Sequence, residues 1–234
     1  LLADYGEQLF REVIRHINVS LDSLQSEKFK QITGRDLFSK VWDGLESARK
    51  LGFKIKLNVV AMKGVNDDEF HDFAQLAIDK KIQVRFIEFM PVGEKSTWQK
   101  EKFIKADEIK QLISGRGTLH PFQSRQGAGP ARMFELEADD ARKGVVGFIS
   151  PISHHFCDQC NRLRLTSEGR LRSCLLNDQE TDLKTLLRGG ASDLEIAQQI
   201  RTTVTNKPQG HTMEGGLETS ARMNCVGQMS RIGG

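Results

Sequence analysis

The sequence lacks a long apolar run, a signal-like opening and an excess of charge of one sign. No apolar stretch approaches the roughly 20 residues that a helix needs to cross a bilayer. No charged segment followed by an apolar one opens the chain, as a secretory signal would. Because the net charge is only +3, no dominant basic surface for a nucleic-acid polymer is expected. These absences favour a cytoplasmic protein that binds neither membranes nor nucleic acid.

Cysteine is scarce and unevenly distributed. Three of the four cysteines, Cys157, Cys160 and Cys174, fall close together, whereas Cys225 stands alone. A secreted disulfide framework would spread its cysteines and would usually occur in a smaller chain. The clustering therefore predicts a metal site, and Cys225 is interpreted as a buried or incidental thiol.

The first part of the chain alternates between helix-like and strand-like segments, judged from the spacing of its apolar residues. The expected elements are a helix at 1–15, a strand at 17–21, a helix ending at Leu51, a strand at 53–60, a helix from Asn66 with Phe70, Phe73, Leu76 and Ala77 on its buried face, and a strand at 83–90. Asp22 with Gln25, and Asn66 with Glu69, have the spacing of helix-capping pairs. This order predicts parallel strands with right-handed crossovers.

The pattern changes after about Gly93. The elements expected there are a helix at 106–113, strands at 132–136 and 145–149, a hairpin of 162–166 with 170–174, and short helices at 182–187 and 193–201. We therefore expect two domains, a parallel unit at 1–95 and a mixed unit at 96–234.

The spacing Cys157-x-x-Cys160, followed by thirteen residues and Cys174, is the most specific motif in the chain. The expected hairpin returns Cys174 to the side of the CxxC pair, so three thiolates can meet. Three thiolates suit a zinc site completed by His154 or His155, or an iron–sulfur cluster with one iron left open. The spacing alone favours neither.

Arginines flank this motif. Because alternate side chains of a strand share a face, Arg162 and Arg164 should lie on the face of Cys160, while Arg170 and Arg172 share a face of the returning strand. Arginine grips phosphate oxygens with paired hydrogen bonds. We interpret Arg162 and Arg164 as anion-binding, and Arg170 and Arg172 as a solvated basic face.

Six segments occur together in the order Asn18–Ser23, Leu57–Gly64, Arg85–Met90, Phe156–Leu165, Cys174–Leu175 and Ile232–Gly234. In combination they resemble the GTP 3′,8-cyclases, the molybdenum cofactor biosynthesis protein A family of radical-SAM enzymes, over essentially the whole chain. The resemblance implies an α/β fold made of the last three parallel strands of a partial, TIM-like (β/α)6 barrel. A C-terminal α+β extension would follow, with a metal-binding hairpin that holds the family's second 4Fe–4S cluster.

Carried over residue by residue, the resemblance also implies contacts. Ser20 and Met90 would contact S-adenosylmethionine, Lys63 and Arg85 the phosphates of GTP, and Arg162 and Arg164 also GTP. Cys157, Cys160 and Cys174 would bind the cluster whose open iron faces the guanine. Gly233 and Gly234 would form a tail that reaches the active site. Ser20, Lys63 and Met90 stand at the ends of expected strands, where barrel enzymes place their chemistry.

In this family a 5′-deoxyadenosyl radical removes the H3′ atom of GTP, and the carbon radical closes onto C8 of the guanine, so holding GTP in position is the protein's main task. The CxxxCxxC motif for the S-adenosylmethionine cluster does not occur in these 234 residues. We therefore expect this chain alone to be inactive, and its unpaired strand edge to promote self-association, for example as a homodimer. Two alternatives stay open: a zinc-stabilised, non-enzymatic binding module, and a radical-SAM enzyme for another substrate.

Overall fold

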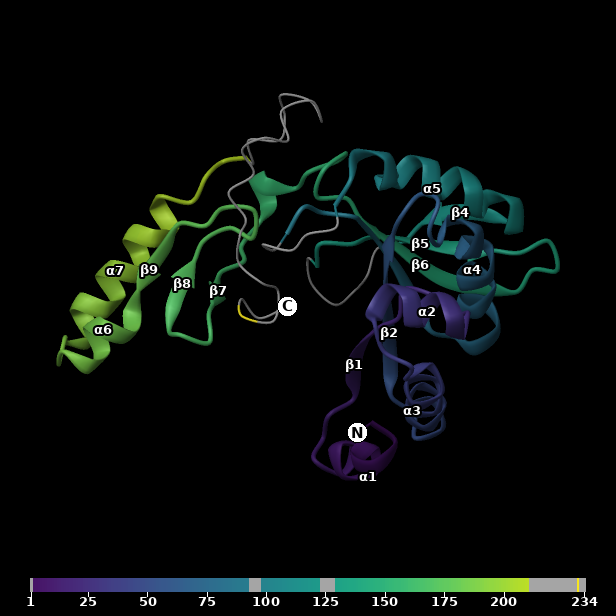
Figure 1. The fold of residues 1–234 in the computed structure, drawn as a ribbon, viewed down its shortest axis with the longest axis horizontal. Coiled ribbons are helices and arrows are strands. Elements are labelled where there is room, and N and C mark those ends of the chain that lie inside the picture. Colours follow the sequence, from purple (N-terminus) through teal and green to yellow (C-terminus); the bar gives the residue numbers. More distant parts are fainter. Residues whose placement is uncertain (1, 93–97, 123–128, 211–230, 232–234) are drawn as a thin grey trace. The chain divides into compact units, whose positions relative to one another are not determined.

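The structure is a computed structural model that describes residues 2–92, 98–122, 129–210 and 231. The chain divides into two compact units (Figure 1): unit 1 contains residues 1–89 and 101–153, and unit 2 contains residues 90–100 and 154–234. Residues 101–153, which the sequence placed in the second domain, thus group with the parallel strands. No helix in the described ranges is long and apolar enough to cross a membrane.

Unit 1 is built on a six-stranded sheet with the strand order β1-β2-β3-β6-β5-β4. Its strands are β1 (His16–Ser20), β2 (Lys54–Ala61), β3 (Gln83–Glu88), β4 (Thr118–Pro121), β5 (Arg132–Glu137) and β6 (Lys143–Ile149). β1, β2, β3 and β6 pair in parallel, and β4 and β5 are antiparallel. β6 explains the position of residues 101–153, because it pairs with β3 and extends the same sheet.

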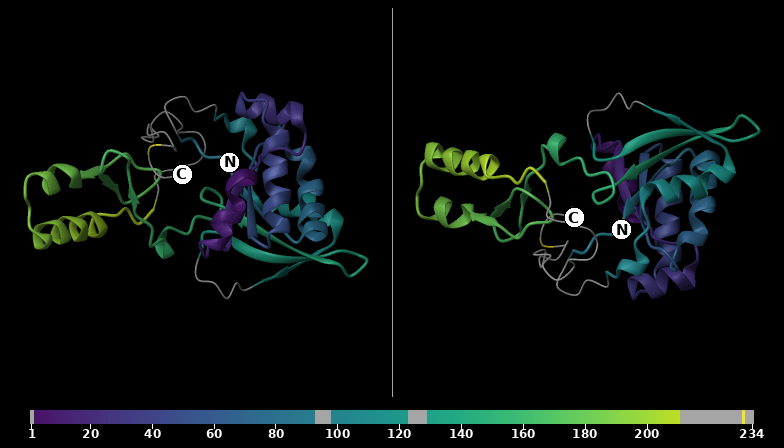
Figure 2. Two further views of the ribbon diagram at one scale, coloured as in Figure 1. Left: turned by 90° about the horizontal axis from the view of Figure 1, so that it is seen from below. Right: turned by 90° about the horizontal axis from the view of Figure 1, so that it is seen from above.

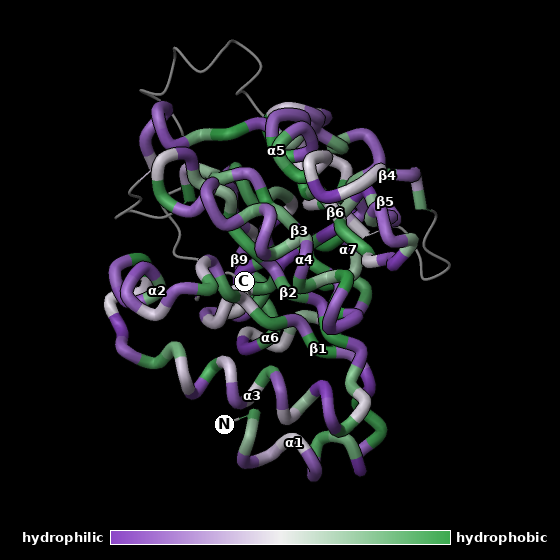
Figure 3. Tube along the Cα trace, turned by 90° about the vertical axis from the view of Figure 1, so that its right-hand side faces the viewer, coloured by the Kyte–Doolittle hydropathy of each residue, from purple (hydrophilic) through white to green (hydrophobic). Residues whose placement is uncertain are grey.

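Helices alternate with these strands, as the sequence predicted. They are α1 (Leu2–Arg11), α2 (Ser26–Thr33), α3 (Phe38–Lys50), α4 (Phe70–Lys80) and α5 (Ala106–Ile113), with short 3-10 turns η1 (Asp67–Glu69), η2 (Lys100–Lys102) and η3 (Ser114–Arg116). The amphipathic character of α3 is visible as alternating hydrophobic and hydrophilic segments (Figure 3). The α/β class and the parallel order of the first three strands are confirmed.

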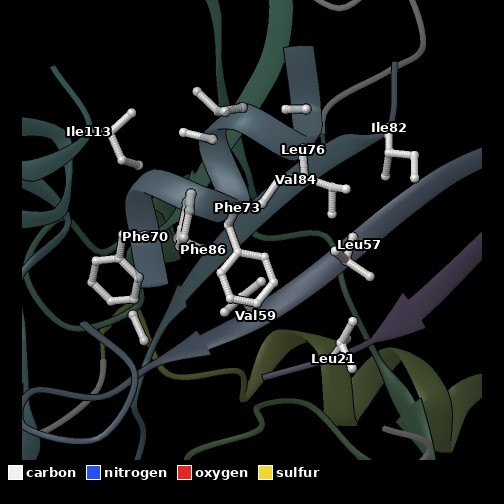
Figure 4. Close-up of a cluster of buried hydrophobic side chains, with 14 of the residues drawn as sticks. Leu21, Leu57, Val59, Phe70, Phe73, Leu76, Ile82, Val84, Phe86 and Ile113 are labelled. Atoms are coloured by element: carbon white, nitrogen blue, oxygen red, sulfur yellow. The ribbon is translucent and has the colours of Figure 1, made fainter. Parts of the chain in front are cut away.

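A core of apolar side chains lies between the sheet and α4 (Figure 4). The ring of Phe86 on β3 meets the rings of Phe70 and Phe73 edge-on, with centroids 5.2 and 6.3 Å apart. Leu76 and Ala77 are buried as well, so the expected buried face of this helix is confirmed. Each large side chain buried in this way contributes about 1.5–3 kcal/mol.

The opposite face of the parallel strands carries a row of polar side chains beside the apolar Val60 and Ile87. Burial alternates along β2, and Leu57 and Val59 point into the core while Lys56 and Asn58 do not. Arg85 continues the polar row on β3, because its Cα pairs with that of Asn58. One face of the sheet therefore packs into the core, and the other carries polar side chains across β2 and β3.

The two expected capping pairs are wrong. α2 begins at Ser26 without a side-chain cap, and the Asp22 carboxylate instead accepts a hydrogen bond from the amide of Val60 at 2.8 Å. Asn66 and Glu69 make no side-chain cap either. Their side chains instead form hydrogen bonds with backbone groups near the ends of β1 and β2. Because buried backbone groups need hydrogen-bond partners, these long-range bonds form in place of the local caps.

Unit 2 contains a three-stranded antiparallel sheet with the order β7-β8-β9. Its elements are η4 (Cys157–Gln159), β7 (Arg164–Leu165), β8 (Arg170–Arg172), β9 (Glu180–Asp182), α6 (Leu183–Arg188) and α7 (Asp193–Thr205). α6 and α7 lie side by side (Figure 2). The expected hairpin is confirmed, with Arg164 opposite Arg172 and Leu165 opposite Leu171.

Candidate functional site

In unit 1, the sequence-predicted residues lie along the polar face and the carboxyl ends of the parallel strands. Ser20 is the last residue of β1, and Lys63 follows β2; both are exposed. The amide of Lys63 donates to the carbonyl of Lys102 at 2.8 Å, which fixes the backbone of this loop. Met90 follows β3, is half-buried, and belongs to unit 2.

Arg85 is held across the polar face of the sheet. Its Nη2 donates to Oδ1 of Asn18, two strands away, at 2.6 Å. Burial lowers the pKa of its guanidinium. Gly147 on β6 is the backbone partner of Arg85, and a Cβ built there would come within 3.2 Å of Arg85 Cγ. The closest atom to such a Cβ would be Sδ of Met133 at 2.6 Å, so the glycine leaves room for both Met133 and Arg85.

Asn66 locks the ends of β1 and β2 together. Its Oδ1 accepts from the amide of Met62 at 2.8 Å, and its Nδ2 donates to the carbonyls of Asp22 and Val60 at 2.6 and 2.9 Å. The spacing of Asn66 and Glu69 predicted a helix cap, and this prediction is wrong. The short polar side chain of Asn66 in the loop between β2 and α4 was the only available signal.

Glu69 supports the same edge from η1. Its side chain is 1% exposed, and its carboxylate accepts from Ser23 Oγ at 2.9 Å and from the amide of Leu24 at 2.6 Å. Lys28 Nζ lies 3.0 Å from it and neutralises its charge. The loop after Ser20 is thus fixed by a buried, paired carboxylate.

Glu88 also fixes the backbone with a buried carboxylate, at the end of β3. It is only 1% exposed, and its carboxylate accepts from the amides of Ala106, Ile152 and Ser153 at 3.0, 2.9 and 2.9 Å, and from Ser153 Oγ. Glu88 was not predicted as a site residue. Strand alternation could have indicated it, because alternation puts Glu88 on the buried face with Phe86.

In unit 2, the three clustered cysteines are half-buried and form no disulfide with one another. Cys157 and Cys160 bracket the η4 turn, where the amide of Cys160 donates to the carbonyl of Cys157 at 3.2 Å. Cys174 comes two residues after β8. In the described ranges, no three His, Cys, Asp or Glu side chains are grouped closely enough to hold one metal ion.

The surroundings of Cys160 suit a metal ligand. Burial raises the pKa of its thiol, but the backbone amide of Arg162 and the ammonium of Lys207 outweigh burial, so the pKa of Cys160 lies below its ordinary value. The thiolate is the form that binds metals. The donor set therefore fits an iron–sulfur cluster in its chemistry and in its electrostatic environment.

The expected alternation around this motif is confirmed. Cys160, Arg162 and Arg164 are half-buried, whereas the intervening Leu163 and Leu165 are exposed. The guanidinium of Arg162 lies over the ring of Phe156, 4.9 Å from its centroid.

The pKa of Arg164 is lowered by burial and by the charges of Arg162 and Arg172, while Cys160 and Cys174 act in the opposite direction. Arg164 is thus within electrostatic reach of two of the three thiols. An arginine in this position can bind an anion beside a cluster.

The expectation of a solvated basic face is wrong for Arg172. Its side chain is 0% exposed, and its Nη2 donates to the carbonyl of Asn177 and to Oδ1 of Asp178 at 2.7 and 2.6 Å. β9 covers one side of β8. The side chain of Arg172 therefore hydrogen-bonds to the turn that follows β8 instead of facing water. Arg170 is exposed, with Nε 3.9 Å from Glu180, as expected.

Some sequence-predicted residues lie outside the described residues. They are Gly233 and Gly234, interpreted as a functional tail, and Cys225.

Comparison with known proteins gives consistent matches along the chain. Residues 1–77 match the Radical SAM superfamily, and residues 82–213 match the Molybdenum Cofactor Synthesis C family. A GTP 3′,8-cyclase from Thermodesulfovibrio yellowstonii is 44% identical over 236 residues, covering 100% of this chain and 69% of the relative. One from Syntrophomonas wolfei is 45% identical, covering 97% and 70%. One from Listeria monocytogenes is 39% identical, covering 100% and 69%.

Proposed function

Because the chain belongs to the GTP 3′,8-cyclase family, we infer that it is a radical-SAM lyase of molybdenum cofactor biosynthesis. The family's reaction is the cyclisation of GTP to (8S)-3′,8-cyclo-7,8-dihydroguanosine 5′-triphosphate, to which these 234 residues would contribute GTP binding and the second 4Fe–4S cluster. The observation that carries this conclusion is the 44% identity to a GTP 3′,8-cyclase over the whole chain. A zinc-stabilised, non-enzymatic binding module would not be expected to match the Radical SAM superfamily, as residues 1–77 do.

Radical-SAM chemistry uses S-adenosylmethionine and 4Fe–4S clusters. We propose that Cys157, Cys160 and Cys174 hold one cluster and leave one iron free for the guanine of GTP. The support is the half-burial of all three thiols and the low pKa of Cys160. When bound, the cluster would supply an open coordination position that fixes the base.

Arg162 and Arg164 are proposed to bind GTP beside this cluster. Cys160 and Cys174 both act to raise the pKa of Arg164, so its guanidinium lies within electrostatic reach of both thiols. Each charge-assisted hydrogen bond to an anion contributes roughly 1.5–3 kcal/mol. The glycines Gly233 and Gly234 would approach the same ligands, since a backbone without a side chain can come close.

Unit 1 is proposed to supply Ser20 to S-adenosylmethionine, and Lys63 and Arg85 to the phosphates of GTP. Met90, which follows β3, is the second proposed contact with S-adenosylmethionine. The exposure of Lys63 and the fixed orientation of Arg85 support this assignment. We further propose that β1, β2 and β3 correspond to neighbouring strands of the (β/α)6 barrel.

The test of this function is equilibrium binding of GTP to the anaerobically reconstituted protein, with ATP as the control nucleotide. Guanine-specific contacts to the cluster should make GTP bind about tenfold or more tightly than ATP, since tenfold needs only about 1.4 kcal/mol. Equal affinities would contradict a GTP cyclase and favour a radical-SAM enzyme for another substrate. Stoichiometric zinc without iron uptake would favour the zinc-stabilised module.

A further inference from the structure

Lys207, just after α7, directs its ammonium at the cysteine segment. Nζ donates to Cys160 Sγ at 3.3 Å, to the carbonyl of Cys160 at 2.7 Å and to the carbonyl of Arg162 at 2.9 Å. An ammonium has three protons, and these three acceptors use all of them. The side chain is half-buried, so these bonds are partly shielded from competing water.

The two carbonyls show what this contact does to the chain. Alternate carbonyls of an extended segment point the same way, and Cys160 is extended, with φ −81° and ψ 108°. One ammonium between the carbonyls of Cys160 and Arg162 therefore holds the segment straight. The sulfur of Cys160 and the side chain of Arg162 are kept on one face by the same contact.

Lys207 reaches this position from a rigid element. α7 begins with a capping box between Ser192 and Glu195. Near its other end, Thr203 is buried, and its Oγ1 lies 2.8 Å from that of Thr181 on β9. The amide of Lys207 then donates to the carbonyl of Val204 at 3.1 Å. The ammonium is thus placed by packing.

A hydrogen bond to a ligand sulfur and a nearby positive charge both change the properties of an iron–sulfur cluster. Both stabilise its more negative, reduced state, and hydrogen bonds to the sulfurs and net charge are known determinants of cluster potential. Lys207 brings both to the same sulfur. None of the six segments that resemble the family includes it.

We propose that Lys207 is a positioning residue of the second cluster: it donates a hydrogen bond to the sulfur of Cys160, raises the reduction potential of the cluster, and fixes the segment that presents Arg162. This proposal rests on the proposed function, because it takes Cys160 as a cluster ligand.

The first experiment compares Lys207→Met with Lys184→Met after anaerobic reconstitution. Lys184 is an exposed lysine on α6, and its substitution removes the same charge without touching the cysteine segment. The cluster signal is identified as the one lost in a Cys174→Ala variant. We expect a more negative reduction potential in Lys207→Met, and an unchanged potential in Lys184→Met. Equal potentials in the two variants would overturn the proposal.

The second experiment does not depend on a folded Lys207 variant. The unaltered protein is made with lysine labelled with ¹⁵N at the side-chain nitrogen, and the reduced cluster is examined by electron–nuclear double resonance. A ¹⁵N coupling from a lysine is expected at the Cys174-dependent signal. Its absence would overturn the proposal even if Lys207→Met cannot be obtained in folded form.

Failure of the proposed function and failure of the role of Lys207 would give different results. If the unaltered protein takes up no iron at Cys157, Cys160 and Cys174, the proposed function fails. If it takes up iron and shows no lysine coupling, only the role of Lys207 fails.

Discussion

The carboxylate of Glu88 accepts a hydrogen bond from the amide of Ser153 at 2.9 Å, which joins the end of β3 to the loop that leaves β6. The same carboxylate also accepts hydrogen bonds from the amides of Ala106 and Ile152. One buried side chain therefore fixes three backbone segments within unit 1. Met90, a proposed S-adenosylmethionine contact, comes two residues later in the chain.

Replacing Glu88 with Gln should destabilise unit 1. The amide nitrogen of Gln is a donor and would face the donors that the carboxylate now satisfies, and each buried group left unpaired costs about 1–3 kcal/mol. We expect the free energy of unfolding in urea to fall by about 2–4 kcal/mol. Glu101→Gln, at an exposed position, is the matched control. Equal stability of the two variants would contradict this role.

Arg172 should stabilise the hairpin of unit 2. Its removal breaks the hydrogen bonds to Asp178 and to the carbonyl of Asn177, and breaking a buried ion pair costs about 3–5 kcal/mol. Arg172→Met should therefore unfold at a clearly lower urea concentration. Arg170→Met, at an exposed position, should change stability by less than about 0.5 kcal/mol. Similar losses in both variants would show that burial is not the cause.

Arg164 should serve binding more than folding. Arg164→Ala should weaken GTP binding about tenfold or more, because a charge-assisted contact of roughly 1.5–3 kcal/mol is lost. The thermal midpoint should stay close to that of the unaltered protein. Arg170→Ala removes an exposed arginine of the same hairpin and should leave GTP affinity unchanged. Unchanged affinity with a lower midpoint in Arg164→Ala would make this arginine structural.

Asp22 should make stability depend on pH. Burial raises its pKa, and the hydrogen bond from the amide of Val60 opposes this effect only partly. The folded protein thus holds this proton more tightly than the unfolded chain does. The contribution to stability is complete below the unfolded pKa of about 3.9 and is lost as the pH rises through the higher folded pKa.

Asp22→Asn keeps an oxygen that can accept from Val60 but removes the charge. Its unfolding free energy should fall less with rising pH over that window, and the variant should be at least as stable as the unaltered protein near neutral pH. Asp43→Asn, at an exposed position, should keep the original pH profile. A profile of Asp22→Asn that parallels the unaltered protein would contradict the raised pKa.

Local patterns in the sequence were sufficient for elements whose apolar spacing is regular. α5 occupies the predicted residues 106–113, and the strand before Met90 lies within its predicted range. The parallel pairing of β6 with β3 was not predicted, because it joins segments about 60 residues apart and leaves no local signature. β4 was missed, since it is a short edge strand that includes Pro121.

The candidate site was predictable to a similar extent. Strand alternation correctly put Arg162 and Arg164 on the face of Cys160. Alternation could not distinguish Arg172 from Arg170, because the burial of Arg172 depends on β9 and on the turn at Asn177. Lys207 was not predicted either, since only the packing of α7 brings it to Cys160.

The central claim is that Cys157, Cys160 and Cys174 hold the cluster to which GTP binds. The most direct measurement is the iron content and GTP affinity of the anaerobically reconstituted protein, compared with a variant in which these three cysteines are alanine. We predict a difference of about four irons per chain and a loss of GTP affinity in the variant. Equal iron content, or GTP binding that does not change when the three cysteines are removed, would contradict the account.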